Sequence, residues 1–544
     1  MFIPDCSTGD GGRQSASTPA MKDDAQLKHD TSMKVAANVI GSLFVGAGIA
    51  SAIVIYLAGY PFAKNLFNSD ALYLPTLMRD LLADGGRIQD WYLTPAPYFF
   101  PDYPLFFIAY LAAPTAYLQF AVFAALQILA LLLALFILAK CAVRRAWLAA
   151  CLITLAFVWF AVGFGEPFVL LLTSAYHYGA FICALVLVAM WMLVIRQQPG
   201  PTRYGWLLVA CAIAFLATLS DNIFIVQASV PFLAANICFD IAMRRLAFGR
   251  MLNAFAIVIA SFAGALSYRF VVTHDTRYPI EIGLAKAGAN LADLYSISYK
   301  AIATNMVYQV ILIAYVGIVI WTGARLFTML WSKSARASMG EDGRWRLFWL
   351  CVFSLFSICS TIAVETLVKS LPVREKYLIA AFSWPVVIVI LWGAYTRLSA
   401  LASLALSAVF VSMLGYKSYG LATTKGLDFE FYPAELACLD DALRAAGAQN
   451  GIAQYWDAKE IQSFSRLRLH IAPYFDGPAQ FRWITPGRYF RDRYDFAIIS
   501  EKAPSIYKIS REALSKFNGA PEREVRCADR SLLIYGKDQM KTGP

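Results

Sequence analysis

The chain has 544 residues, of which 59% are hydrophobic and only 15% charged, and its formal net charge is +11. Soluble proteins are about 45–50% apolar and about 25% charged, so this much apolar side chain cannot be buried within a soluble fold. The composition excludes a soluble enzyme, a disordered chain and a disulfide-rich secreted module, and it predicts a protein that crosses a membrane several times.

The first segment, residues 1–35, is polar and contains no apolar stretch of the kind found in a cleaved signal peptide. We expect it to be a disordered cytoplasmic tail. Apolar runs follow, and a helix needs roughly 20 such residues to cross the hydrocarbon layer. Eleven spans are predicted within a transmembrane domain of residues 36–416, and the run at 104–139 holds one span and a shorter approach segment. The runs are 37–59, 104–139, 147–164, 177–195, 204–220, 223–242, 252–272, 305–330, 347–367, 377–396 and 399–416.

The basic residues predict the orientation of these spans. Short loops on the cytoplasmic side of membrane proteins are enriched in Lys and Arg. If the N-terminus is cytoplasmic, every inner loop is basic. These loops contain Lys140, Arg144, Arg145, Arg196, Arg203, Arg244, Arg245, Arg250, the segment 325–346 and Arg397. The outer loops are then 60–103, 165–176, 220–222, 273–304 and 368–376. This placement accounts for the positive charge without a nucleic-acid partner.

The last segment, residues 417–544, becomes polar, and an odd number of spans places it on the outer side. A helix over 433–446 that ends at Gly447, with strands at 467–471, 496–499 and 532–535, predicts a small α/β domain. Cys438 and Cys527 are the two cysteines on this side, where disulfides persist. They are expected either to form a disulfide or to be two buried thiols. The chain has no Asn-x-Ser/Thr sequence, which favours a bacterial inner membrane and a periplasmic domain.

Several chemical signals are absent from the sequence. There is no Walker A loop, no His-Glu-x-x-His motif, no pair of Cys-x-x-Cys motifs and no internal repeat. Polar residues instead gather where the spans meet the outer loops. Ionisable groups at this depth are costly unless they face water or a partner, so they are functional candidates. The polar and aromatic candidates are Asp70, Trp91, Tyr98 and Asp102 in the first outer loop, Glu166 in the second with Tyr176 and His177 close behind it, then Asp221, Arg269, Arg374, Lys376 and Tyr377.

Each of these candidates also has a purely structural interpretation. Asp70, with Ser69, is suited to cap an amphipathic helix over 71–83. Glu166 is able to form a structural ion pair, and Asp221 with Asn222 to form a turn between two spans. His177 fits a packed helix interface, and the basic pair Arg374 and Lys376 fits an anchor for lipid headgroups.

Two stretches resemble the GT-C glycosyltransferases, membrane enzymes that move a sugar from a polyprenyl-phosphate carrier to an acceptor at the outer face. Asp70, with Tyr73 after it in the first outer loop, is similar to the acidic residue that serves this family as catalytic base. The stretch 374–385, which opens with Arg374-Glu375-Lys376-Tyr377, is similar to the basic-Tyr-Leu pattern of the dolichyl-phosphate-mannose and aminoarabinose transferase branch, where basic residues contact the lipid phosphate. The chain departs from the family at Ala71, where many relatives have a second acidic residue, and Glu166 stands alone where metal-using relatives have an acidic pair. These departures argue against a divalent metal cofactor, which stays an open alternative.

The resemblance implies a GT-C-like fold and an inverting sugar transfer on the periplasmic face. Asp70 is then the base, supported by Glu166, and Arg374, Lys376, Tyr377 and Arg269 bind the donor phosphate. Trp91, Tyr98, Asp102 and His177 are further candidates for substrate binding. The implied partners are a polyprenyl-phosphate sugar, membrane lipids and a glycan, lipid or protein acceptor. Two alternatives stay open: a transporter or lipid flippase without bond chemistry, and an assembly or sensor protein with an outer binding domain.

Overall fold

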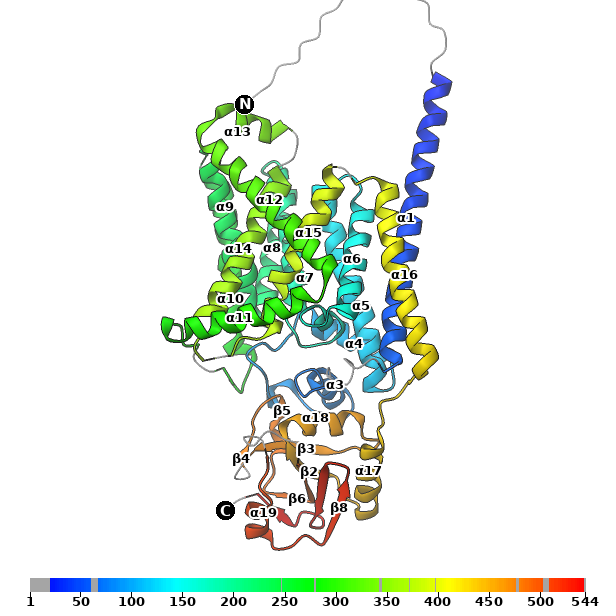
Figure 1. Cartoon of the computed structure of the whole chain (residues 1–544). Helices are drawn as coiled ribbons and strands as arrows, with labels where there is room; N and C mark the ends of the chain where they lie inside the picture. The colour runs from blue at the N-terminus through cyan, green and yellow to red at the C-terminus, as the bar shows by residue number, and fades with distance from the viewer. Residues whose placement is uncertain are drawn as a thin grey trace, which may run out of the picture.

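The computed structural model describes residues 20–59, 67–245, 247–277, 280–341, 345–370, 372–396, 398–475, 479–501 and 508–542. Its helices form an antiparallel bundle, and a sheet-containing domain lies at one end of that bundle (Figure 1). Within this described part, eleven helical segments are long and apolar enough to cross a membrane, as predicted. They are α1 (Ala20–Leu57), α5 (Ala116–Ala142), α6 (Ala146–Gly163), α7 (Tyr178–Arg196), α8 (Pro201–Ser220), η3 with α9 (Ile225–Ser229, Val230–Ala242), α10 (Phe248–Val271), α12 (Met306–Trp331), α14 (Trp345–Leu367), η5 with α15 (Glu375–Leu378, Ile379–Thr396) and α16 (Ala400–Lys425).

The two ends of the membrane domain differ from the prediction. Helix α1 begins at Ala20, so the expected disordered tail is wrong for residues 20–35, and residues 1–19 lie outside the described part. Helix α16 continues to Lys425, beyond the expected boundary at 416. The residue that caps it is Gly426, whose φ of 78° is readily adopted by glycine. The additional helical residues, 20–35 in α1 and 417–425 in α16, are mostly polar. A span predicted from apolar residues alone ends with the hydrocarbon layer and therefore leaves them out.

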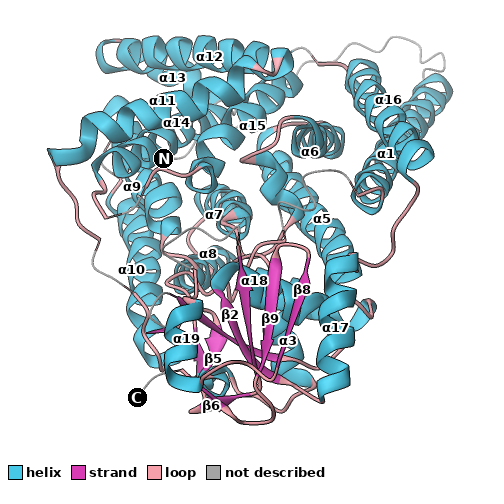
Figure 2. Ribbon diagram, turned by 60° about the horizontal axis from the view of Figure 1, so that its bottom comes forward, coloured by secondary structure: helices cyan, strands magenta, loops and turns pink. Residues whose placement is uncertain are grey.

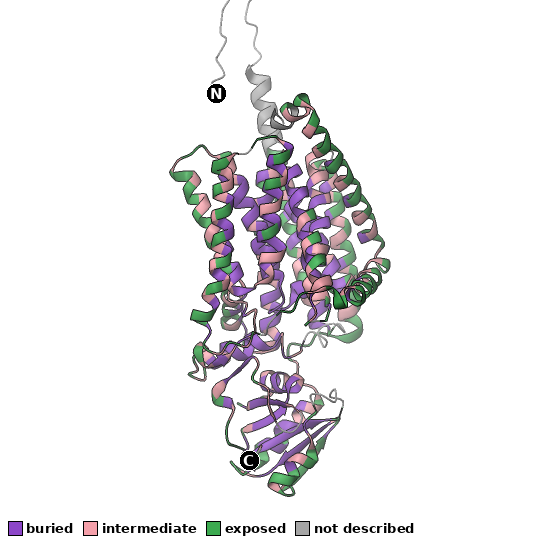
Figure 3. Cartoon of the chain, turned by 90° about the vertical axis from the view of Figure 1, so that its left-hand side faces the viewer, coloured by how far each residue is buried: buried purple, intermediate pink, exposed green. Residues whose placement is uncertain are grey.

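The bundle has an inner and an outer layer. Figure 3 shows buried residues in the centre of the bundle and exposed residues along its outer helices. Side chains of α6 and α7 are mostly buried, whereas α12 and α16 expose much of their apolar surface. In a membrane the exposed apolar faces lie against lipid. Helices α8 and α10 pack closely at Gly264, where a Cβ atom would lie 2.2 Å from the carbonyl oxygen of Phe215. The two helices can therefore approach this closely only because Gly264 has no side chain.

The loops at the end of the bundle that bears the sheet domain, which we call the domain face, contain structure of their own. The first loop contains α3 (Tyr73–Leu82), η1 (Ile88–Asp90) and β1 (Trp91–Tyr92), and it leads to α4 (Asp102–Ala112), the predicted approach segment. The fourth loop contains η4 (Leu284–Lys286) and α11 (Ala287–Ala303), which lies across the end of the bundle (Figure 1). At the opposite face, α13 (Lys333–Glu341) follows α12.

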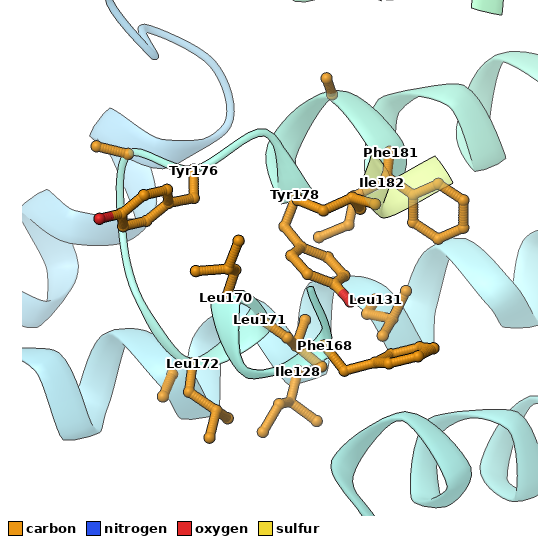
Figure 4. Packing of buried hydrophobic residues seen from close by; sticks show 14 of the residues in the cluster. Ile128, Leu131, Phe168, Leu170, Leu171, Leu172, Tyr176, Tyr178, Phe181 and Ile182 are labelled. Atoms are coloured by element: carbon orange, nitrogen blue, oxygen red, sulfur yellow. The ribbon is translucent and has the colours of Figure 1, made fainter. Parts of the chain in front are cut away.

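The second loop folds back into the bundle. Its short helix η2 (Phe168–Leu172) packs its side chains against α5 and α7 (Figure 4). The side chain of Gln127 on α5 donates a 2.8 Å hydrogen bond to the carbonyl oxygen of Leu171. Irregular backbone at this depth requires such partners, because lipid provides none. The loop therefore holds Tyr176 and His177 in fixed positions at the domain face.

The C-terminal domain is built on a six-stranded mixed sheet with the order β4-β3-β2-β7-β9-β8 (Figure 2). Its central strands β3, β2 and β7 are parallel, and the outer pairs are antiparallel. The elements are α17 (Ala434–Ala446), β2 (Asn450–Gln454), α18 (Tyr455–Phe464), β3 (His470–Phe475), β4 (Ala479–Gln480), β5 (Thr485–Pro486), η6 (Gly487–Tyr489), β6 (Arg493–Tyr494), β7 (Phe496–Ser500), α19 (Arg511–Asn518), β8 (Arg523–Cys527), β9 (Arg530–Ile534) and β10 (Met540–Lys541).

One strand of this domain begins later than predicted. The alternating residues 467–471 suggested a strand, but β3 begins at His470. Asp440 accepts hydrogen bonds from the hydroxyl of Ser465 and from the backbone of Arg466, and these contacts hold the preceding residues in a turn. The helix ending at Gly447 and the strands near 496–499 and 532–535 lie where they were expected.

The C-terminal domain and the first loop form one contact region. Strand β1 of the loop pairs antiparallel with β5 of the domain, which joins Trp91 to Pro486 and Tyr92 to Thr485. The guanidinium of Arg79 donates hydrogen bonds to the carbonyl oxygens of Gln462 and Leu469 at 2.8 and 3.1 Å. The domain is therefore bound to the same loop that contains Asp70.

Candidate functional site

Asp70 lies in the turn that leads into α3. The side chain of Asn68 closes this turn, because its Oδ1 accepts hydrogen bonds from the backbone N–H groups of Asp70 and Ala71 at 3.0 and 3.1 Å. Helix α3 has Leu72 at its N-cap and no side-chain cap of its own. The interpretation of Asp70 as a helix cap is therefore wrong, and its carboxylate is available for other contacts.

Lys376 approaches this carboxylate from the start of the tenth span. Its Nζ lies 3.9 Å from Oδ2 of Asp70, and the side chains of Asp70 and Lys376 are 30% and 27% exposed. The pair is thus within electrostatic contact, is wider than a hydrogen bond, and remains accessible to water. Two residues 306 positions apart in the sequence therefore meet at this site.

The backbone that carries Lys376 is held by an irregular turn in the neighbouring span. Helix η3 is a π-turn, and the amide of Gln227 within it donates a 2.8 Å hydrogen bond to the carbonyl oxygen of Tyr377. The carbonyl oxygen of Gln227 in turn accepts a 2.6 Å bond from Ser357 of α14. Turns of this type are frequent at functional sites, and this one fixes the height of Lys376 at the end of the bundle.

Tyr455 of the C-terminal domain completes the carboxylate's surroundings. Its hydroxyl donates a hydrogen bond to Oδ1 of Asp70. Burial, reinforced by the charge of Asp70, raises the pKa of Tyr455 well above its ordinary value. The phenol therefore keeps its proton and acts as a donor. Because Tyr455 holds Oδ1, the Oδ2 atom is the one that faces Lys376.

The domain has a specific means of placing Tyr455. Tyr455 is the first residue of α18, directly after the central strand β2, where the side chain of Gln454 caps the helix by accepting from Trp456 at 3.1 Å. Arg530 on β9 then binds the same helix through Asp457 and Glu460, at 2.8 and 2.7 Å. The side chain of Arg530 is only 9% exposed, so this ion pairing fixes α18 on the sheet.

Two tyrosines surround the ammonium group of Lys376. Its Nζ lies 5.9 Å from the ring centroid of Tyr176 and 5.4 Å from that of Tyr377. These distances fall within the range of cation–π attraction. The hydroxyl of Tyr176 also exchanges hydrogen bonds with the side-chain amide of Asn68, at 2.8 and 3.1 Å. The second loop is thereby tied to the turn that carries Asp70.

A second polar group lies beside the first. Nδ1 of His177 and Oδ2 of Asp221 are 2.6 Å apart, and both side chains are buried. Asp221 also accepts a 3.2 Å bond from the backbone of Ile223, so it both shapes the turn between two spans and orients the imidazole. Within the described part, Nε2 of His177 has no hydrogen-bond partner.

Tyr98 connects the two groups. The ring centroids of Tyr98 and His177 are 5.8 Å apart, and those of His177 and Tyr377 are 5.1 Å apart. Burial raises the pKa of Tyr98, and the charges of Asp221 and Asp70 act in the same direction. Its φ of 60° is unusual for a residue other than glycine, which indicates local backbone strain.

Asp102 lies deeper than these residues. It is 2% exposed, and its Oδ2 accepts a 3.1 Å bond from the backbone N–H of Ala175 in the second loop. Burial raises the pKa of Asp102 to about 7. A Cβ atom at Gly179 would lie 2.6 Å from its Oδ1, so the glycine makes room for the carboxyl group. Asp102 therefore links the first loop to the second.

Glu166 and Arg374 lie at the outer margin of the site. Both side chains are exposed, and the charges of Glu375, Lys376 and Arg374 act on the carboxyl group of Glu166. Arg374 is the N-cap residue of η5, two positions before Lys376, and makes no ion pair with any described residue. Its guanidinium is thus available to a ligand.

Trp91 and Arg269 do not join this group. Trp91 is 1% exposed and donates a 2.8 Å hydrogen bond from its indole to Asp80, inside the contact between loop and domain. Arg269 lies at the end of α10 with its guanidinium 4.9 Å from the ring of Phe270. Neither contacts Asp70 or Lys376 within the described residues.

The structure thus brings together Asp70, Lys376, Tyr377, Tyr98 and His177, with Asp102, Glu166 and Arg374 around them. Sequence reasoning missed Tyr455 and Asn68. Asn68 had a usable signal, since Asn two residues before Asp70 is typical of a side-chain-capped turn. Tyr455 had none. Among the described residues, no three His, Cys, Asp or Glu side chains lie where they could hold a metal ion.

Fold and site together define a multi-span membrane protein in which an extramembrane domain completes a charged site at the domain face. No protein-family model matches the chain, and no curated protein matches it. The crystal structure of an oligosaccharyltransferase from Archaeoglobus fulgidus, in complex with Zn and sulfate, is similar to the chain with a TM-score of 0.37 and 14% identity. The match covers 73% of this chain and 57% of that one, so the chain spans a little over half of its length. Similarity at this level assigns neither a family nor an activity.

Proposed function

We propose that this protein is a glycosyltransferase that moves a sugar from a polyprenyl-phosphate carrier to an acceptor hydroxyl at the domain face. The observation that supports this most is the pair formed by Asp70 and Lys376, whose charged atoms lie 3.9 Å apart while both side chains are partly exposed. A carboxylate facing a cation provides the two functions that this reaction needs. One removes a proton from the acceptor, and the other neutralises the leaving phosphate.

The residues of the site account for each step of the proposed reaction. Oδ2 of Asp70 accepts the proton of the acceptor hydroxyl as the acceptor oxygen bonds to the anomeric carbon. The bond between that carbon and the phosphate oxygen breaks, and the phosphate leaves with the electron pair. Lys376, with Arg374 beside it, neutralises the negative charge that forms. Attack from the face opposite the phosphate inverts the anomeric configuration, and Tyr455 holds the other carboxylate oxygen in place.

A lipid carrier accounts for the position of the site. The prenyl chain of such a donor stays in the hydrocarbon layer while its phosphate lies at the interface with water, which is the height at which η5 begins the tenth span. Tyr98, Tyr377 and His177 provide aromatic surface next to the charged pair. We assign them to the sugar or to the first units of the carrier.

The location and partners belong to the same proposal. The basic loops at the opposite face favour a cytoplasmic N-terminus, which puts the C-terminal domain in the periplasm of a bacterial inner membrane. The domain already provides Tyr455, and we propose that it also contributes to recognition of the glycan, lipid or protein acceptor.

The test uses the purified full chain with a polyprenyl-phosphate sugar, and it measures the lipid phosphate released. Asp70→Asn keeps the hydrogen bond from Tyr455 but removes the base, so turnover should fall about 100-fold or more. Asp90→Asn is the matched control, because Asp90 is an acid of the same loop that pairs with Arg87 at 3.7 Å, away from the site. Full turnover by Asp70→Asn would overturn the assignment. Sugar-lipid transport across proteoliposomes without release of phosphate would favour a transporter.

A further inference from the structure

A large cavity lies at the face of the bundle opposite the C-terminal domain. Its volume is about 1890 Å³, and its walls come from α1 and α16 on one side and α12 on the other, with the ends of α5, α14 and α15 between them. Figure 2 shows α12 and the pair α1 and α16 on separate sides of α15 and α6. Pockets for small molecules and cofactors measure about 300–1000 Å³, so this cavity suits a larger occupant.

The mouth of the cavity is basic. Lys34, Lys140, Arg144, Arg145 and Arg346 line it, and no acidic side chain of the described residues does. Arg145 donates a 2.9 Å bond to the carbonyl oxygen of Leu398, and Arg346 a 2.8 Å bond to that of Cys141. Lys140 and Arg144 are exposed and make no ion pair with the described residues. Their positive charge is thus available to an anion.

The inner part of the cavity is apolar and extends along the middle of α12. Ala314, Gly317, Ile318 and Trp321 of that helix line it, as do Leu401 and Leu404 of α16. The lining residues of α12, from Ala314 to Trp321, extend over about 10 Å at the rise of an α-helix. No atom would lie within 4 Å of a Cβ at Gly317, so the cavity stays open beside this glycine.

We propose that this cavity is a binding site for an anionic phospholipid of the adjacent leaflet. A basic mouth above an apolar channel matches a molecule with a negatively charged headgroup and acyl chains, and basic pockets between membrane helices bind such headgroups. The site is separate from Asp70 and Lys376, which lie at the domain face, and it does not depend on the proposed glycosyl transfer.

The headgroup is tested with the purified full chain in detergent. Native mass spectrometry compares retention of phosphatidylglycerol with that of phosphatidylcholine carrying the same acyl chains. The wild type should retain more phosphatidylglycerol than phosphatidylcholine. In the double variant Lys140→Gln and Arg144→Gln, the ratio of the two retained lipids should fall about tenfold. Arg244→Gln with Arg245→Gln is the matched control, because it removes the same charge from another exposed loop of this face. Equal retention of the two lipids, or an equal loss in both double variants, would overturn the proposal.

The shape of the cavity is tested without a change of charge. Gly317→Leu places a side chain in the acyl channel and should lower retention of both lipids at least about fivefold. Gly323→Leu is its control, since Gly323 lies on the same helix, also has nothing within 4 Å of its Cβ position, and does not line the cavity. If Gly317→Leu retains phosphatidylglycerol like the wild type, the lipid does not occupy this channel and the proposal fails.

Discussion

The hydrogen bond from Tyr455 to Asp70 joins the C-terminal domain to the first loop of the membrane domain. We expect Tyr455→Phe to lower kcat about 10-fold to 100-fold, because a hydrogen bond to a charged group contributes about 1.5–3 kcal/mol. The KM for the donor should stay the same, since Lys376 and Arg374 are untouched. Steady-state release of lipid phosphate measures both constants.

The control for this variant is Tyr474→Phe, which removes a hydroxyl that lies 3.1 Å from Tyr494 in the core of the domain. If both variants lower kcat equally, the effect comes from a loosened domain and not from the contact with Asp70. A Tyr455→Phe protein with the kcat of the wild type would show that the hydroxyl does not position the carboxylate.

Lys459 gives the domain a pH-dependent stability. Its Nζ is buried without a hydrogen-bond partner among the described residues, 4.9 Å from the ring of Trp91, and burial lowers its pKa to about 7. The unfolded chain binds this proton up to about pH 10.5, so stability increases as the pH rises above 7, by about 2 kcal/mol between pH 7 and 9. Lys459→Met should remove this increase, which thermal unfolding at a series of pH values measures. If the stability of Lys459→Met rises with pH as in the wild type, Lys459 does not cause the increase. Lys516→Met, which removes a cation from α19 of the same domain, is the control.

Single residues of the site were predictable to different degrees. Asp70 and Lys376 were identified because a charged group beside a span is costly and needs a function. Their contact, and the role of Tyr455, were not predictable, since a tyrosine at the start of a helix carries no mark of a partner 385 positions away. The sequence suggests Trp91 as a substrate-binding residue because it does not show whether an indole in a loop is buried, and the structure buries it.

Among the elements, the packing of α8 on α10 depends on Gly264. Gly264→Ala should destabilise the protein by about 1–3 kcal/mol, because the new Cβ would lie 2.2 Å from a backbone oxygen that cannot move easily. Gly249→Ala on the same helix meets nothing within 4 Å and should be neutral or stabilising by up to about 1 kcal/mol. Thermal unfolding in detergent compares the two. Equal effects would show that helix propensity, and not the contact with α8, decides the outcome.

The spanning helices were predictable because the hydrocarbon layer sets both their length and their composition. Elements outside that layer were harder. Helix η2 folds back as a buried apolar segment that is too short to cross, and α11 lies along the face with a composition between loop and span. Strand β3 was placed too early, since alternation of apolar residues does not reveal the turn that Asp440 holds.

At the scale of the whole molecule, the disulfide between Cys438 and Cys527 joins α17 to the end of β8, with the Cα atoms 5.8 Å apart. It links positions separated by 89 residues, and closing a loop of that length in the unfolded chain accounts for about 4–5 kcal/mol of stability. Replacing both cysteines by alanine should therefore make the C-terminal domain sensitive to limited proteolysis at lower denaturant concentration. Cys359→Ala, at an exposed free thiol in α14, is the control and should leave the domain resistant. Equal resistance of the double variant would show that the bond adds little.

The two-part organisation was predictable from composition, because the chain becomes polar after the last span. The position of the domain was not. This position depends on Arg79, which binds two carbonyl oxygens of the domain, and on the pairing of β1 in the first loop with β5 in the domain. Contacts to backbone atoms leave no pattern in the sequence.

The order of synthesis gives the contact between Tyr455 and Asp70 one more consequence. The ribosome makes the carboxylate early and its phenol 385 residues later, which takes about 20–80 s at ordinary rates of translation. During this interval the membrane already contains the nascent helices, but the site around Asp70 still lacks Tyr455. Under the proposed function, an unfinished polypeptide has no complete active centre with which to consume lipid-linked sugar, and competence begins only when the final domain has folded.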